Sequence, residues 1–136
     1  PGRGQSAREA GAVRCAAGHS IVVRDYASAS QQFPLAFGTP AEFALRDPMS
    51  LMKNYADRRQ IPLQKVWIDI GKQDDPLFLR QARLFKRELV RVGYSTNRGD
   101  KLDVDLTDGR HDDIYWKQRM AEYISWYDRC FLSSRR

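Results

Sequence analysis

Polar residues suited to acid–base chemistry follow two short apolar stretches of this chain. Asp74 and Asp75 come after the stretch 65–70, and His111 comes after the stretch 102–106. A carboxylate beside a histidine is a common catalytic pair. The imidazole accepts a proton from a nucleophile, and the carboxylate fixes its tautomer and stabilises its charged form. The spacing leaves room for one helix and one strand between acid and base.

The segments around this pair predict strands that alternate with helices. Residues 65–70 are almost continuously apolar, as in a strand covered on both faces. In residues 102–106, apolar residues alternate with aspartates. This pattern indicates a strand with one solvated face near a sheet edge. Between them, apolar residues recur at helical spacing. We predict strands at 12–17, 65–70 and 102–106, and helices at 48–58, 76–92 and 112–131.

The helix ends carry ordinary capping signals. Asp47 precedes Pro48, and Asp74 or Asp75 caps the helix that begins at Pro76. Gly93 ends that helix. The last helix is predicted to bury a stripe consisting of Trp116, Met120, Ile124, Tyr127 and Phe131.

This order of elements predicts a single α/β domain over residues 1–136, with a mostly parallel sheet and covering helices. We expect a loose segment at 1–10, an irregular insertion with short helical pieces at 21–46, and a polar tail at 132–136. The carboxyl ends of parallel strands meet at one edge of a sheet, where ligands gather. The acid and the histidine should therefore lie close together.

Composition limits the other classes of function. The chain of 136 residues is 42% hydrophobic and 29% charged, with a net charge of +6. Its basic residues are spread along 80–91 and are interpreted as the solvated face of a helix. A nucleic-acid-binding surface is the alternative, but no such signature accompanies the charge, so we expect no nucleic-acid partner.

No apolar run approaches the roughly 20 residues of a membrane span, so no membrane span is expected. Cys15 and Cys130 lack metal-ligand spacing, and we predict two buried thiols rather than a disulfide. No metal or other cofactor is indicated. Residues 1–20 show no signal peptide, and the compartment stays open.

Several motifs together resemble a known family. The segment 66–74, with the pattern Gly71-x-x-Asp74 after a strand, is similar to the acid-bearing segment of the putative-esterase branch of α/β-hydrolases. This branch includes esterase D (S-formylglutathione hydrolase), feruloyl esterases and mycolyltransferases. The segment 109–116 resembles the family's Gly-x-His motif followed by Trp. The segments 16–20 and 37–48 resemble the strand after the nucleophile helix and the insertion that follows it. The resemblance covers roughly residues 10–131.

The resemblance implies that Asp74 is the acid and His111 the base of a catalytic triad, with Asp75 as the second choice for the acid. Asp75, next to Pro76, also suits a helix cap. His19 and Trp116 are assigned as residues that line the substrate site, and a structural role for His19 stays open.

The chain departs from the family at the nucleophile. The elbow Gly-x-Ser-x-Gly is absent, and the nearest string is 18–22, in which Val22 stands where the motif has glycine. The strained elbow needs small residues around its serine, so Ser20 is not expected to be the nucleophile. The resemblance thus implies a partial α/β-hydrolase fold, consisting of C-terminal strands and helices without the N-terminal strands and the elbow.

Two functions from different classes follow. The first is a serine esterase or acyl-transfer hydrolase that acts on small-molecule esters, for which this chain supplies acid and base and is inactive alone. The alternative is a non-catalytic α/β module that binds a ligand or partner. In either case an uncovered sheet edge invites self-association.

Overall fold

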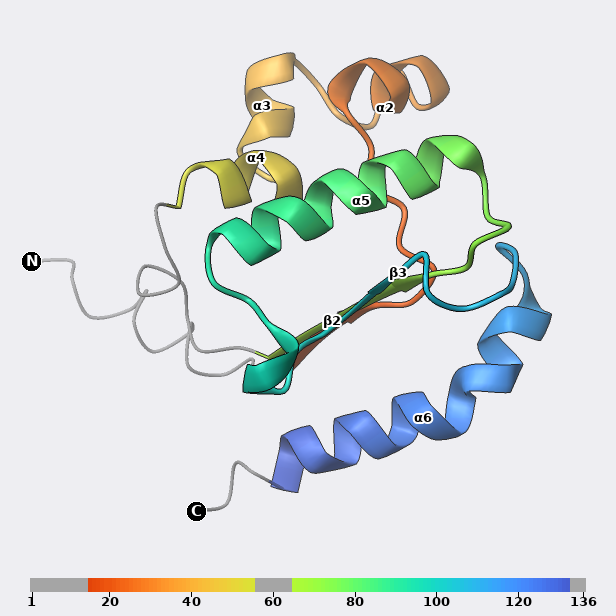
Figure 1. The fold of residues 1–136 in the computed structure, drawn as a ribbon. Coiled ribbons are helices and arrows are strands. Elements are labelled where there is room, and N and C mark those ends of the chain that lie inside the picture. Colours follow the sequence, from red (N-terminus) through yellow and green to blue (C-terminus); the bar gives the residue numbers. More distant parts are fainter. Residues whose placement is uncertain (1–14, 56–64, 133–136) are drawn as a thin grey trace, which may run out of the picture.

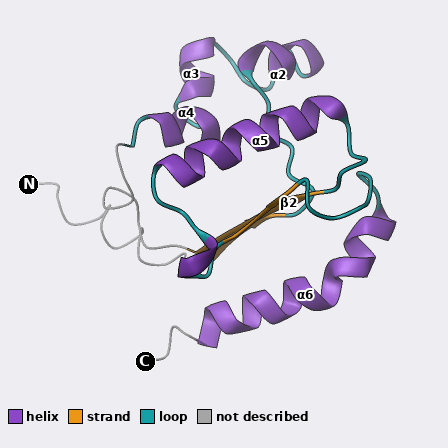
Figure 2. Ribbon diagram, viewed as in Figure 1, coloured by secondary structure: helices purple, strands orange, loops and turns teal. Residues whose placement is uncertain are grey.

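The computed structural model describes residues 15–55 and 65–132 and arranges them in three layers (Figure 1). A three-stranded sheet lies between α6 (Asp113–Leu132) on one side and a group of four helices on the other. This group consists of α2 (Tyr26–Gln32), α3 (Pro40–Ala44), α4 (Pro48–Lys53) and α5 (Pro76–Arg91). Figure 2 shows the same arrangement by type of secondary structure.

The sheet is parallel, with the strand order β1-β2-β3. Its strands are β1 (Cys15–Gly18), β2 (Lys65–Ile70) and β3 (Lys101–Val104), and a short 3₁₀ turn, η2 (Thr96–Arg98), precedes β3. Trp67 of β2 is in register with Ala17 of β1 and Lys101 of β3. The predicted α/β class with three parallel strands is therefore confirmed.

Alternate residues of β2 enter two different cores, because successive side chains of a strand point to opposite faces. Ile68 and Ile70 pack against the apolar face of α5. Trp67 packs against Tyr123 and Trp126 of α6. Both faces of β2 are covered, which explains its almost continuously apolar sequence.

Two predicted elements are shorter than expected. The helix predicted to reach residue 58 ends at Lys53, and Arg91 of α5 donates to the carbonyls of Met52 and Tyr55 just there. The strand predicted to reach residue 106 ends at Val104. The next residue, Asp105, has a φ of 65°, which is incompatible with a strand. The predictions for 1–10, for 12–14 and for 133–136 lie outside the described residues.

The buried face of α6 differs from the predicted one. The buried residues are Tyr115, Arg119, Tyr123, Trp126 and Cys130. The predicted stripe is shifted by one residue, so that most of its members are exposed on the neighbouring face, with exposed fractions between 47% and 64% for Met120, Ile124 and Phe131. The helix turns this stripe inward because the sheet offers partners for it, namely the buried carboxylate of Asp69 and the half-cystine Cys15.

The prediction of two free thiols was wrong. Cys15 at the start of β1 and Cys130 in the last turn of α6 form a disulfide, with their Cα atoms 6.3 Å apart. The bond joins strand and helix across 115 residues of sequence. Such bonds persist mainly in oxidising compartments.

Candidate acid–base site

Two glycines bring the loops after β2 and β3 into direct backbone contact. A side chain on Gly71 would collide with the backbone of Gly109, and one on Gly109 would collide with the ring of Tyr115. Gly109 also has a φ of 148°, which favours glycine. The amides of Lys72 and Gln73 donate to the carbonyls of the opposite loop at 2.9 and 3.0 Å. The loops that carry Asp74 and His111 are thereby fixed side by side.

The structure brings the predicted acid and base together. Nδ1 of His111 lies 3.3 Å from Oδ2 of Asp74. The side chain of Asp74 is fully buried, whereas that of His111 is 37% exposed. The acid is therefore shielded beneath a ring that still reaches solvent.

Ser20 is the third member of the cluster, a role that sequence analysis did not assign to it. Its hydroxyl donates to Oδ2 of Asp74 at 2.8 Å and lies 3.0 Å from Nδ1 of His111. Ser20 is 3% exposed and has a φ of 53°, an uncommon value for a residue other than glycine. Its amide donates to Oδ1 of Asp69 at 2.8 Å, which helps to hold this backbone conformation.

These contacts determine which imidazole nitrogen carries the proton. The Ser20 hydroxyl already directs its proton at Asp74, so its lone pairs face Nδ1. The carboxylate also faces Nδ1, and a lone pair on that nitrogen would be repelled by both oxygens. We therefore assign the proton of neutral His111 to Nδ1. Its Nε2 then has a free lone pair and no hydrogen-bond partner among the described residues.

This geometry differs from a complete triad in one respect. In a triad the serine hydroxyl contacts Nε2, on the side of the ring opposite the acid. Here Ser20 contacts Nδ1, on the same side as Asp74. Ser20 therefore contacts the acid, and no described residue forms a hydrogen bond with Nε2, where a triad nucleophile would lie.

Asp75 has a structural role. It is the N-cap of α5, and Oδ1 of its carboxylate accepts from the amide of Leu77 at 2.7 Å. Its own amide donates to Oδ1 of Asp74 at 2.7 Å. Asp75 thus begins the helix and contributes a donor to the neighbouring carboxylate, whereas only Asp74 contacts His111 among the two.

Aromatic rings flank the base on two sides. The rings of Phe78 and Trp116 lie edge-on to His111, with centroids 5.7 and 5.4 Å away. The indole N–H of Trp116 is buried and has no acceptor among the described residues. Trp116 thus lies against His111, and its role in substrate binding stays a prediction.

His19 lies on the other side of the sheet. Its ring stacks on Tyr123 of α6 with the centroids 3.6 Å apart, and its Nδ1 lies 3.5 Å from Oδ1 of Asp69. No described contact joins it to Asp74 or His111. This placement agrees with the structural alternative for His19, and its role in substrate binding stays a prediction.

Asp69 is the buried carboxylate that connects the two sides of the sheet. It accepts hydrogen bonds from the Ser20 amide and from the Tyr123 hydroxyl, the latter at 2.7 Å, and Nε of Arg119 lies 3.2 Å away. Burial acts to raise the pKa of Asp69, but hydrogen bonds from His19, Tyr123 and Ser20 outweigh it and hold the pKa below its ordinary value. Asp69 thus stays ionised and positions Ser20.

The tyrosines around Asp69 respond in the opposite direction. Burial, and then the hydrogen bond and charge of Asp69, raise the pKa of Tyr123. Burial and the same charge raise the pKa of Tyr115. Both hydroxyls therefore remain protonated. The sequence carried a signal for this network, because a carboxylate inside an apolar strand must find buried partners.

Comparison of the chain with protein-family models, curated proteins and solved structures gives no match. The described residues hold no group of three or more potential metal ligands. Across 15–55 and 65–132, no helix combines the length and apolar character that crossing a membrane requires.

Proposed function

We propose that Asp74 and His111 are the acid and base of a serine esterase or acyl-transfer hydrolase with an α/β-hydrolase fold, and that the nucleophile comes from a segment outside these 136 residues. The proposal is supported above all by one observation. A buried carboxylate faces Nδ1 of a histidine whose Nε2 has no described partner. The resemblance to putative esterases agrees with this assignment.

In the proposed reaction, Nε2 of His111 accepts the proton of a serine hydroxyl while the oxygen of that serine attacks the ester carbonyl. The imidazolium that forms then gives this proton to the leaving alcohol. Asp74 stabilises the imidazolium and holds the ring in place. The hydroxyl of Ser20 and the amide of Asp75 orient Asp74 through hydrogen bonds.

The tautomer of His111 is the direct test. Long-range proton–nitrogen NMR correlations in mildly alkaline solution should show neutral His111 with its proton on Nδ1. Asp74→Asn should weaken this preference, because an amide can also donate to Nδ1. Ser20→Ala is the matched control and should keep the wild-type tautomer, since Asp74 remains. A wild-type proton on Nε2 would contradict the proposal, because that nitrogen could not accept a proton.

A second measurement addresses Ser20. We expect no labelling of the isolated chain by a fluorophosphonate probe for activated serines, and no saturable ester hydrolysis. Loss of a triad nucleophile lowers the rate on the order of a millionfold. Covalent labelling at Ser20 would make Ser20 itself the nucleophile and refute the supporting role assigned to it.

A further inference from the structure

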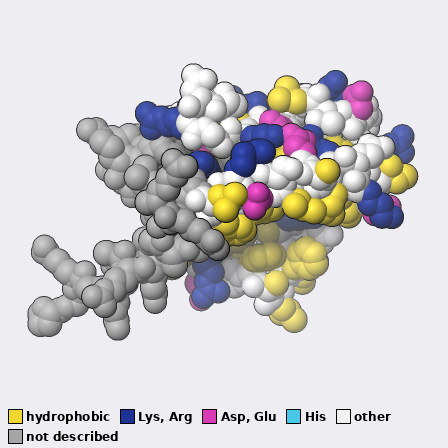
Figure 3. All heavy atoms as spheres, turned by 90° about the horizontal axis from the view of Figure 1, so that it is seen from below, with side chains coloured by type: hydrophobic (Ala, Val, Ile, Leu, Met, Phe, Trp, Pro, Cys, Tyr) yellow, Lys and Arg dark blue, Asp and Glu magenta, His cyan; other side chains and the backbone are white. Residues whose placement is uncertain are grey.

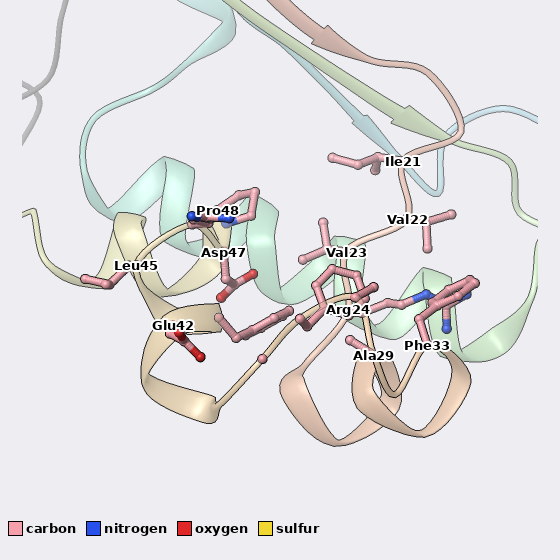
Figure 4. Close-up of a pocket in the computed structure, with 15 residues that line it drawn as sticks. Ile21, Val22, Val23, Arg24, Ala29, Phe33, Glu42, Leu45, Asp47 and Pro48 are labelled. Carbon is pink, nitrogen blue, oxygen red and sulfur yellow. The ribbon is translucent and has the colours of Figure 1, made fainter.

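A cavity of about 640 Å³ opens beside the segment that follows Ser20. Its walls come from residues 21–24, from α2 and α3, and from the turns that follow these helices. Most of the lining is apolar, and Figure 4 shows Val22, Phe33 and Leu45 among it. The volume falls within the range of sites for small organic molecules, roughly 300–1,000 Å³.

The carboxylates in the wall are occupied by contacts with the backbone. Glu42 accepts from the amide and hydroxyl of Thr39 at 2.8 and 2.9 Å in a capping box. Asp47 accepts from the amide and hydroxyl of Ser50, both at 2.7 Å. These hydrogen bonds satisfy the two helix N-termini. The charge of Arg46, the other arginine of the wall, helps to lower the pKa of Glu42, after the hydrogen bonds from Thr39. Among the described residues neither carboxylate forms an ion pair with Arg24.

The wall contains two arginines, Arg24 and Arg46, and Arg24 is the one that contacts an aromatic ring. Its guanidinium lies over the ring of Phe78, with Cζ 5.0 Å from the centroid. Among the described residues Arg24 forms no ion pair. The N–H groups of Arg24 also have no hydrogen-bond acceptor among the described residues, so they can bind an anion. In Figure 4 the Arg24 side chain reaches toward Phe33 at one end of the apolar lining.

Phe78 connects this cavity to the acid–base pair. One contact of its ring is the guanidinium of Arg24, and another is the ring of His111, 5.7 Å between centroids. The chain also runs directly from Ser20, bonded to Asp74, into Ile21 and Val22 of the cavity wall. The ring of Phe78 would therefore lie between His111 and a molecule bound at Arg24.

We propose that this cavity is a substrate subsite that takes an apolar group bearing a carboxylate, with the carboxylate bound by Arg24. That the ligand is a substrate rests on the proposed function. That the cavity binds such a ligand rests on the cavity alone. Phe33, Val22 and Leu45 would cover the apolar part. Arg24 would bind the carboxylate through two parallel N–H···O hydrogen bonds, the bidentate geometry that is frequent in arginine–carboxylate pairs.

Binding of 4-phenylbutyrate, compared with its neutral amide 4-phenylbutanamide, tests the subsite on the whole chain. By ligand-observed NMR, the carboxylate should bind about tenfold more tightly than the amide, as one charge-assisted hydrogen-bond pair predicts. Arg24→Gln should remove this difference and leave amide binding unchanged. Arg129→Gln, which removes an exposed arginine of α6, is the matched control and should retain the difference.

The site of binding has its own readout. The aromatic ligand should shift the ring resonances of His111 and leave those of His19, on the opposite side of the sheet, unchanged. Equal affinity for acid and amide, or a difference that survives Arg24→Gln, would overturn the proposal. No shift at His111 would also overturn it, because the ligand would then lie elsewhere.

These outcomes are separate from the test of the acid–base pair. Asp74→Asn should not change the affinity for 4-phenylbutyrate. If His111 proves to carry its proton on Nε2 while the ligand still depends on Arg24, the proposed reaction fails and the cavity stands as a binding site. If the tautomer is as expected and Arg24 has no effect, the subsite fails and the proposed acid–base pair stands.

Discussion

At the scale of single residues, the acid–base pair depends on a carboxylate that touches neither of its members. Asp69 holds the amide of Ser20, and the hydroxyl of Ser20 holds Asp74. Asp69 is fully buried and faces a largely buried Arg119. The charge at the centre of the sheet therefore serves both folding and the geometry of the site.

Asp69→Asn should lower the free energy of unfolding by on the order of 2 kcal/mol at neutral pH, because it weakens the buried hydrogen bonds from Ser20 and Tyr123 to a charged acceptor. It also removes one of the three carboxylates near Arg119. Asp128→Asn removes an exposed carboxylate of α6 and should leave stability nearly unchanged. Urea unfolding of both variants measures the difference.

The effect of Asp69 should also depend on pH, and its sign follows from the lowered pKa. The folded state holds the ionised form, so the stabilisation is fully present above the unfolded pKa of about 3.9 and is lost as the pH falls through the folded pKa. The stability gap between wild type and Asp69→Asn should therefore narrow in acid. A gap independent of pH would contradict an ionised Asp69.

At the scale of elements, close contact of two loops sets the distance between acid and base. The backbone at Gly71 touches that at Gly109, and this contact aligns the loops that follow β2 and β3. The arrangement is the usual one for a parallel sheet, in which strand ends at one edge combine their loops into a site.

Gly71→Ala should separate these loops. Its methyl group would overlap the carbonyl of Gly109, so we expect a loss of stability of about 2 kcal/mol, typical of overpacking. The NMR signature of His111 should also move toward that of Asp74→Asn. Gly18→Ala is the comparison, because the atoms nearest to its methyl group belong to the side chain of Ile21, at 3.1–3.4 Å, and not to the backbone of another loop. Wild-type His111 resonances in Gly71→Ala would show that the contact does not position the pair.

Sequence reasoning succeeded where the signal is local or follows from topology. The apolar run of β2 and the helical spacing of α5 specify their elements directly. The meeting of Asp74 and His111 follows from the shared edge of parallel strands. Their assignment as a catalytic pair remains a proposal.

The errors occurred where distant partners decide. Two neighbouring stripes of α6 were both compatible with burial, and Asp69 and Cys15 selected the more polar one. The disulfide spans 115 residues and has no spacing signal. The support of Asp74 by Ser20 depends on a backbone turn with positive φ, which the sequence 18–22 does not reveal.

At the scale of the whole molecule, the apolar stripe left on the outside of α6 is the main feature without an internal role. Its exposed members include Met120, Ile124 and Phe131. The face seen in Figure 3 shows hydrophobic side chains gathered among charged ones. The outer strands β1 and β3 also border the described sheet. Exposed apolar stripes and sheet edges both favour association between chains.

We therefore expect the chain to self-associate in a concentration-dependent way, as sedimentation velocity can measure. Ile124, 62% exposed, lies in the stripe, so Ile124→Lys should shift the population toward monomer without loss of stability. Gln118→Lys adds the same charge on the polar side of α6 and should leave association unchanged. If Ile124→Lys has no effect while the wild type still associates, the contact lies elsewhere, with the sheet edge as the next surface to test. A wild-type chain that stays monomeric at every concentration tested would show that neither the stripe nor the sheet edge drives association.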